Sequence, residues 1–109
     1  MKDDAALVVY DDLTEIFSLL QYLNDLRERG VRIIIGEFFE TSARNIMCEA
    51  YKQGMTQRQG YVWFLPAWYQ HDWYDTDALR EERGPDKKAF LPNCTTAEMM
   101  EVGFLFPFF

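Results

Sequence analysis

The sequence has few of the side chains on which common enzyme mechanisms depend. Among its 109 residues it has a single histidine, His71, only two cysteines and no Gly-x-Ser-x-Gly motif. A hydrolase that pairs a nucleophile with a histidine base would therefore need His71 together with Cys48 or Cys94. Cys48 falls near the middle of a predicted helix, whereas reactive thiolates favour helix N-termini. The composition argues against a cysteine hydrolase, and we expect no enzymatic activity.

Positive charge is scarce as well. The chain has 11 basic and 18 acidic residues, which gives a net charge of −7. Nucleic acids require a basic binding face, and anionic lipids attract basic segments, so the charge argues against both as partners. A cationic ligand or an amine suits this balance better.

Motifs for metal and phosphate binding are missing too. His71, Asp72, Asp75 and Asp77 lie close together, but their spacing matches neither an EF-hand nor the His-Glu-x-x-His pattern. They are interpreted as part of a solvated acidic loop. Gly36 stands alone after a predicted strand, without the further glycines of a dinucleotide-binding turn. We therefore expect neither a metal nor a cofactor.

Long apolar runs are absent. No stretch approaches the about 18 apolar residues that a membrane helix needs. The first residues, MKDD, are acidic, and the apolar run after them is too short for a secretory signal. The two cysteines leave two free thiols or one bridge open. Hydrophobic residues make up 49% of the chain and aromatic residues 17%, which predicts a folded domain.

Hydrophobic periodicity predicts an α/β fold with a partial parallel sheet of order β-α-β-α-β. Strands are expected over residues 6–10, 32–36 and 61–66, and helices over residues 12–29 and from about Thr41, as the N-cap, to about Gly54. Right-handed crossovers would place the strands in parallel. Such a sheet leaves two open edges, which indicates that further structure is missing.

The last third of the chain combines a charged segment with an apolar end. Residues 75–88 are strongly charged and contain Gly84-Pro85, so we expect a long exposed loop there. Thr95-x-x-Glu98 matches a capping box and predicts a short helix to about Val102. The chain ends in GFLFPFF, an apolar segment that needs a partner surface.

Aromatic residues gather where the predicted strands end. Phe39 follows the strand that ends at Gly36, and Trp68 follows the next strand along the chain. Ligands of open parallel sheets bind outside the carboxyl ends of the strands. An aromatic face attracts an ammonium group, and it also packs against an apolar chain. The sequence therefore predicts an amino-acid site with Phe39 and Trp68 on one side.

Several uncommon features recur in a recognisable order: I-I-G-x-F-x-E-T-x-A-R, C-E-x-Y-K, Y-V-W-F-L, W-Y-x-x-x-W and N-C-T. Through them the segment from about Val31 to Met100 resembles the extracellular Venus-flytrap domain of metabotropic GABA type B receptors. The resemblance implies a type I periplasmic-binding-like fold. Residues 1–109 would form a single partial domain, part of the second, membrane-proximal lobe, with 103–109 as a divergent tail.

The resemblance also implies a ligand site. In the family this lobe contacts GABA through a tyrosine after one strand and a tryptophan after the next. The tryptophan corresponds to Trp68. The tyrosine corresponds to Phe39, which lacks the hydroxyl that would bind the ligand's carboxylate. GABA or a related amino acid is therefore expected to bind only with the missing first lobe, and weakly or not at all to this chain alone.

Further implications concern processing and location. The family's disulfide pattern corresponds to Cys48 and Cys94, and Asn93-Cys94-Thr95 fits an N-glycosylation sequon at Asn93. A full receptor would display this lobe on the extracellular face of the plasma membrane beside a partner subunit, with membrane contact only through segments outside this chain.

Two alternatives stay open at this stage. The chain could be a ligand-free dimerising module derived from such a lobe, with GFLFPFF as its contact. The segment ALVVYDDLTEIFSLL also resembles the start of bacterial response-regulator receiver domains, because Asp11 and Asp12 form an acidic pair after a strand. A receiver-like phosphoacceptor needs an aspartate after its third strand, where this chain has Leu-Pro-Ala-Trp-Tyr.

Overall fold

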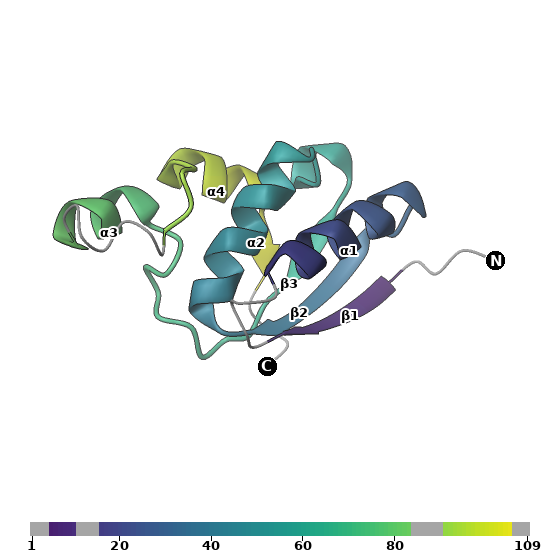
Figure 1. Ribbon diagram of the computed structural model, residues 1–109, viewed down its shortest axis with the longest axis horizontal. Helices are drawn as coiled ribbons and strands as arrows, with labels where there is room; N and C mark the ends of the chain where they lie inside the picture. The colour runs from purple at the N-terminus through teal and green to yellow at the C-terminus, as the bar shows by residue number, and fades with distance from the viewer. Residues whose placement is uncertain (1–4, 11–15, 84–90, 106–109) are drawn as a thin grey trace.

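A parallel sheet forms the base of the molecule in the computed structural model, which describes residues 5–10, 16–83 and 91–105 (Figure 1). Its four strands lie in the order β1-β2-β3-β4, and each pair of neighbours is parallel. The strands are β1 (Ala5–Tyr10), β2 (Ile33–Phe38), β3 (Val62–Phe64) and β4 (Phe104–Leu105). The predicted α/β class with a parallel sheet is confirmed.

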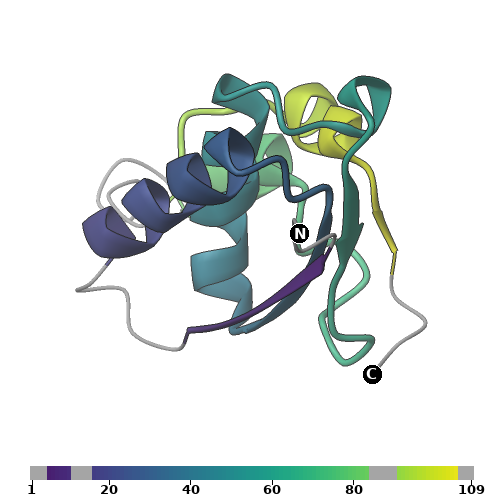
Figure 2. The same ribbon diagram turned by 90° about the vertical axis from the view of Figure 1, so that its right-hand side faces the viewer.

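Helices connect the strands, and α1 (Ile16–Glu28), α2 (Glu40–Lys52) and α4 (Thr96–Val102) lie over one face of the sheet (Figure 2). The 3₁₀ helix η2 (Gln57–Gln59) precedes β3, and α3 (Thr76–Arg83) lies to the side of the sheet, next to α4. When parallel strands follow one another in sequence order, right-handed crossovers place all connections on the same side. Among the described helices, none combines the length and the hydropathy of a membrane span.

The alternation in β2 follows from this one-sided covering. Ile34, Gly36 and Phe38 are buried beneath the helices, whereas Ile33 and Ile35 on the opposite face are only half-buried. A Cβ atom at Gly36 would collide with the ring of Phe38. Glycine therefore lets the Phe38 ring fold back over its own strand.

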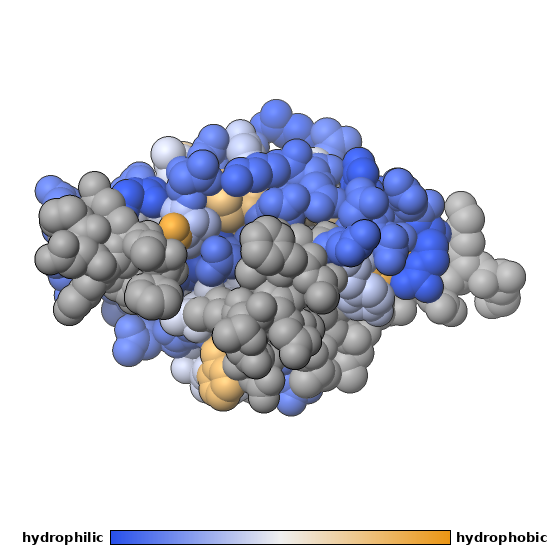
Figure 3. Space-filling model, viewed as in Figure 1, coloured by the Kyte–Doolittle hydropathy of each residue, from blue (hydrophilic) through white to orange (hydrophobic). Residues whose placement is uncertain are grey.

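The core lies between the sheet and helices α1, α2 and α4. Its largest fully buried side chains include Trp63, Leu26, Ile34, Ile46 and Met99. The Trp63 indole N–H donates to the Met55 carbonyl oxygen at 2.9 Å, so β3 is tied to the turn after α2. On the face seen in Figure 3, hydrophilic residues cover most of the described surface along α1 and α2, as expected for the solvated side of the helix layer.

Strand β4 corrects the expected strand count. Phe104 pairs with Trp63 and Leu105 with Phe64. Phe104 is half-buried and packs against the core. The start of GFLFPFF is therefore part of the sheet rather than a free contact surface, whereas residues 106–109 of that segment lie outside the described residues.

Helix α3 corrects the expected loop over residues 75–88. The chain is helical over Thr76–Arg83, and residues 84–90 lie outside the described part. Asp75 Oδ1 accepts a hydrogen bond from the Ala78 N–H at 3.2 Å and caps the first turn. The segment lacks a wide apolar stripe, so periodicity missed a helix made of residues with good helix propensity.

The structure corrects the predicted N-cap of α2 and confirms that of α4. The N-cap of α2 is Phe39, without a side-chain hydrogen bond, rather than Thr41. At α4 the predicted capping box is confirmed, because Thr95 Oγ1 accepts from the Glu98 N–H and Glu98 Oε1 accepts from the Thr95 N–H. The expected caps of α1, Asp11 and Asp12, lie outside the described residues.

Candidate functional site

Phe39 and Trp68 meet at the carboxyl edge of the sheet. Phe39 directly follows β2, and Trp68 follows β3, the neighbouring strand. Their ring centroids are 6.1 Å apart, and the ring planes are inclined at 66°, an edge-to-face pair. Phe39 is 55% exposed and Trp68 is 56% exposed. The structure therefore brings the two predicted residues together as one exposed aromatic surface.

A row of aromatic rings leads from this surface into the core. Trp68 contacts Tyr69 at 4.8 Å between ring centroids, Tyr69 contacts Trp73 at 5.2 Å, and Trp73 contacts Phe104 of β4 at 5.0 Å. Tyr69 and Trp73 are buried. Such pairs each contribute about 0.5–1.5 kcal/mol beyond their area burial. The exposed Trp68 ring therefore packs against buried aromatic side chains.

Tyr69 supplies a polar contact within this row. Its hydroxyl donates a short hydrogen bond to the Phe38 carbonyl oxygen, at the end of β2. Burial, followed by the nearby Glu40 carboxylate, raises the pKa of Tyr69 well above its ordinary value of 10.0. The hydroxyl therefore keeps its proton and remains a donor when an exposed tyrosine would ionise.

This shift predicts a loss of stability at alkaline pH. Above about pH 10 the unfolded chain loses the Tyr69 proton while the folded chain keeps it. The unfolded state then binds fewer protons, so the free energy of unfolding falls, by up to about 1.4 kcal/mol per pH unit. Urea unfolding between about pH 9 and pH 11 measures this slope.

The Tyr69→Phe variant should show a shallower decline than the unmodified chain. Tyr51, whose pKa is also raised, chiefly by the Glu98 carboxylate, is present in both proteins. The difference between the two slopes therefore isolates Tyr69. Equal slopes would contradict the prediction.

The start of α2 holds the segment that carries Trp68. Glu40 Oε1 accepts a hydrogen bond from the Gln70 N–H at 2.7 Å. Arg44 Nε donates to the Trp73 carbonyl oxygen at 2.7 Å, and its guanidinium lies 3.6 Å from Glu40 Oε2. Glu40 was expected at the carboxyl end of the strand, whereas Arg44 was not predicted to take part in the site. Their i,i+4 spacing was the available signal for an ion pair.

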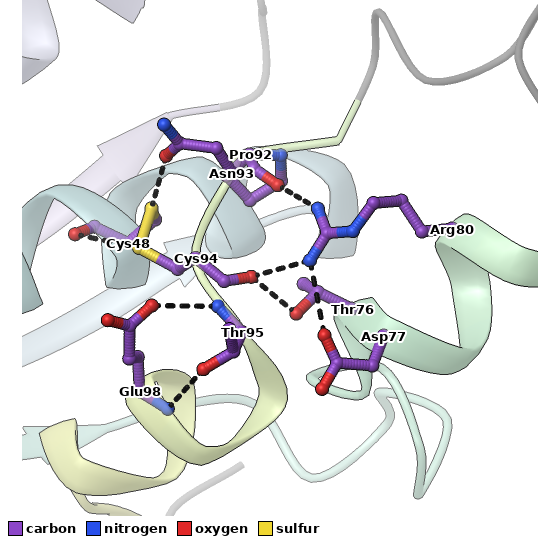
Figure 4. Close-up of a disulfide and its surroundings, with 9 residues drawn as sticks. All are labelled: Cys48, Thr76, Asp77, Arg80, Pro92, Asn93, Cys94, Thr95 and Glu98. Carbon is purple, nitrogen blue, oxygen red and sulfur yellow. Dashed lines mark hydrogen bonds and ion pairs between the residues drawn. A yellow bond between two sulfur atoms is a disulfide. The ribbon is translucent and has the colours of Figure 1, made fainter.

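The two cysteines form a disulfide (Figure 4). The S–S distance is 1.99 Å and the Cα atoms are 5.6 Å apart. The bond joins α2 to the segment before α4, and both residues are buried. It is the pairing that the resemblance implied. Since the chain has no other cysteine, no thiol remains for the cysteine hydrolase considered above.

The Cys94 carbonyl oxygen connects the disulfide to α3. It accepts hydrogen bonds from Thr76 Oγ1 at 2.7 Å and from the Arg80 guanidinium at 2.9 Å. Arg80 also donates to the Pro92 carbonyl oxygen at 2.6 Å. Helix α3 is thus attached to the bridged segment.

Asn93 is exposed beside the bridge. Its Oδ1 lies 3.7 Å from Cys48 Sγ, a van der Waals contact because a bridged sulfur carries no hydrogen. Figure 4 shows the amide nitrogen, the atom that a glycan would modify, pointing away from the disulfide.

His71 and Asp72 are exposed in a turn, as expected for a solvated acidic loop, whereas Asp75 and Asp77 make contacts with α4. Asp75 Oδ1 accepts from Thr96 Oγ1 at 2.8 Å, and Asp77 Oδ2 accepts from the Thr96 N–H at 3.3 Å, so both join α3 to α4. Within the described part of the chain, no group of three potential metal-ligating side chains lies together.

A parallel α/β sheet with exposed aromatic side chains at the carboxyl ends of neighbouring strands is consistent with the periplasmic-binding-like class of ligand-binding proteins. Comparison with known protein families agrees with this class. The model of the receptor family ligand binding region matches residues 6–103, and the chain belongs to this family. This membership replaces the receiver-domain interpretation, whose acidic pair lies outside the described residues.

Individual relatives are receptor subunits. The chain is 37% identical to gamma-aminobutyric acid type B receptor subunit 1 of Mus musculus over 81 residues, 72% of this chain and 7% of that protein. It is 36% identical to subunit 1 of Caenorhabditis elegans over 92 residues, covering 84% and 8% respectively. It is 30% identical to human subunit 2 over 82 residues, covering 69% and 9%. The chain thus spans less than a tenth of the length of these relatives.

Proposed function

We propose that the chain is part of the second lobe of an amino-acid-sensing receptor ectodomain of the GABA type B kind. In this proposal Phe39 and Trp68 form that lobe's side of the ligand cleft. The observation that carries it is the exposed edge-to-face pair at the carboxyl ends of β2 and β3. The similarity to type B receptor subunits supports GABA or a related amino acid as the ligand.

The chemistry of the aromatic surface suits a small zwitterion. Ring faces attract an ammonium group by about 0.5–2 kcal/mol and pack against a methylene chain. Phe39 provides no hydroxyl for the carboxylate, which costs about 1–2 kcal/mol relative to a tyrosine. A single lobe also has no opposing surface to close upon. This chain by itself therefore binds GABA weakly or not at all, and takes part in recognition without catalysing a reaction.

The proposed location is extracellular, on a receptor that pairs with a second subunit. A buried disulfide is stable in the oxidising environment outside the cell. Asn93, exposed within its sequon, is the proposed acceptor of an N-linked glycan. Similarity to both subunit 1 and subunit 2 supports a subunit partner without deciding which of the two roles this chain has.

A chimera tests the proposal, because it supplies the first lobe. Residues 31–100 replace the matching segment in the soluble ectodomain of the mouse subunit 1, and displacement of labelled GABA measures affinity. Phe39→Tyr should strengthen binding about 5- to 30-fold, the equivalent of about 1–2 kcal/mol. Trp68→Ala should weaken it by up to about 30-fold.

The matched control is Phe64→Tyr, which adds the same hydroxyl to a half-buried side chain of β3. Phe64 lies on the face of the sheet that the helices do not cover. This variant should leave affinity unchanged. Unaltered affinity in both Phe39→Tyr and Trp68→Ala, in a chimera that binds GABA, would refute the assigned surface.

A further inference from the structure

Trp68 lies beside Phe39 without being buried. Its side chain is 56% exposed, and it lies between β3 and α3 in a segment without regular helix or strand. Ala67 and Gln70 beside it are also exposed. Burial of the indole therefore cannot account for its position against Phe39, and other contacts must hold this segment.

Those contacts involve the residues that flank the two rings. Phe38 and Glu40 flank Phe39 in the sequence, and Tyr69 and Gln70 directly follow Trp68. The Tyr69 hydroxyl donates to the Phe38 carbonyl oxygen, and the Gln70 N–H donates to Glu40 Oε1 at 2.7 Å. The chain on both sides of Phe39 is thus bonded to the chain just after Trp68.

Arg44 contacts both sides of this arrangement from a buried position. It is 5% exposed, donates to the Trp73 carbonyl oxygen at 2.7 Å, and lies 3.6 Å from the Glu40 carboxylate. Hydrogen bonds in sheltered surroundings are electrostatically stronger than those in water. The ion pair also orients the carboxylate that receives the Gln70 N–H.

We propose that Tyr69, Glu40 and Arg44 are positioning residues that hold the Trp68 ring in its edge-to-face arrangement with Phe39 before any ligand arrives. Together they form a flanking clamp between the β2–α2 junction and the segment from Trp68 to Trp73. A ring held in place in advance loses less conformational freedom when a ligand binds. The value of the clamp for affinity rests on the proposed function, but its effect on ring position does not.

Fluorine NMR of the 109-residue chain, labelled with 5-fluorotryptophan and with its disulfide formed, tests the clamp without a ligand. The chain has three tryptophans, and Trp63 and Trp73 are buried whereas Trp68 is exposed. Trp68→Phe identifies the Trp68 resonance, and Trp63→Phe identifies the Trp63 resonance. Phe39→Leu then gives the shift that this resonance shows once it loses the neighbouring ring.

Tyr69→Phe removes the bond to the Phe38 carbonyl oxygen, and Glu40→Met removes both the acceptor of the Gln70 N–H and the ion pair with Arg44. Both should move the Trp68 resonance toward its position in Phe39→Leu, while the Trp63 resonance stays in place and reports an intact fold. Glu40→Gln keeps an acceptor oxygen for the Gln70 N–H and should return the Trp68 resonance toward its original position. Tyr61→Phe, which removes the hydroxyl of another buried tyrosine, should leave it unmoved.

A Trp68 resonance that stays unshifted in both Tyr69→Phe and Glu40→Met would overturn the proposal. If Glu40→Met displaces the Trp63 resonance and so fails to fold, Tyr69→Phe decides alone. The outcome is separable from the ligand proposal. A shifted resonance combined with a chimera indifferent to Trp68→Ala would support the clamp and refute the cleft, and the reverse combination would refute the clamp only.

Discussion

Opening the Cys48–Cys94 disulfide is expected to lower the free energy of unfolding by about 4 kcal/mol. The bridge spans 46 residues, and in the chain-entropy model a loop of that size restricts the unfolded chain strongly. Small domains have a total stability of only about 5–15 kcal/mol, so this loss is a large share of the whole. Urea unfolding with and without a thiol reductant measures the difference.

The bridge also has a local role that the entropy model omits. The Cys94 carbonyl oxygen anchors α3 through Thr76 and Arg80, so a displaced Cys94 would release that helix. The double variant Cys48→Ala/Cys94→Ala serves as the control, because it lacks the bridge and needs no reductant. It should unfold at the urea concentration of the reduced protein. Equal midpoints for the oxidised and reduced protein would contradict the prediction.

The central β-α-β unit was predictable because its residues satisfy local and tertiary requirements together. The run Ile33–Ile35 favours a strand, and the buried stripe of α2 falls at helical spacing, with Ala43, Ile46, Met47 and Ala50 all buried. Gly54, expected after this helix, adopts a φ of 75°, a conformation that favours glycine. Where periodicity and terminal residues agree, sequence alone determines the element.

The elements missed by sequence reasoning depend on distant partners. Strand β4 has two residues, too few for an alternating pattern, and is defined by its pairing with Trp63 and Phe64. Helix α3 is held by Thr96 and Cys94, which lie well beyond it in the sequence. Neither contact leaves a periodic signal in the residues that form the element.

The candidate site was also predictable only in part. Parallel neighbouring strands end at the same edge, so the proximity of Phe39 and Trp68 followed from topology. Their relative orientation did not, because it depends on the flanking contacts through Tyr69 and Glu40. Those contacts require the exact course of an irregular segment, which hydrophobic patterning does not determine.

Replacing Arg44 by methionine is expected to lower the free energy of unfolding by about 2–3 kcal/mol. The variant keeps a side chain of similar reach but removes the charged donor from the Trp73 carbonyl oxygen, which lies in a buried residue. A charge-assisted hydrogen bond contributes about 1.5–3 kcal/mol. In the variant the Trp73 carbonyl oxygen loses this donor in a buried residue, where water does not readily replace it. Glu40 loses its ion pair but, at 21% side-chain exposure, regains some hydration.

The matched control is Arg58→Met, which removes an exposed arginine from η2 and should change stability by less than about 0.5 kcal/mol. Arg44→Lys restores the charge without the Nε donor, so it should fall between Arg44→Met and the unmodified chain. Glu40→Met/Arg44→Met should cost less than the sum of its single variants, because the two residues contact each other. If Arg44→Met behaves like Arg58→Met, the buried guanidinium does not hold the Trp68 segment, and the ring pair must be maintained by the bonds of Tyr69 and Glu40 and by the aromatic row.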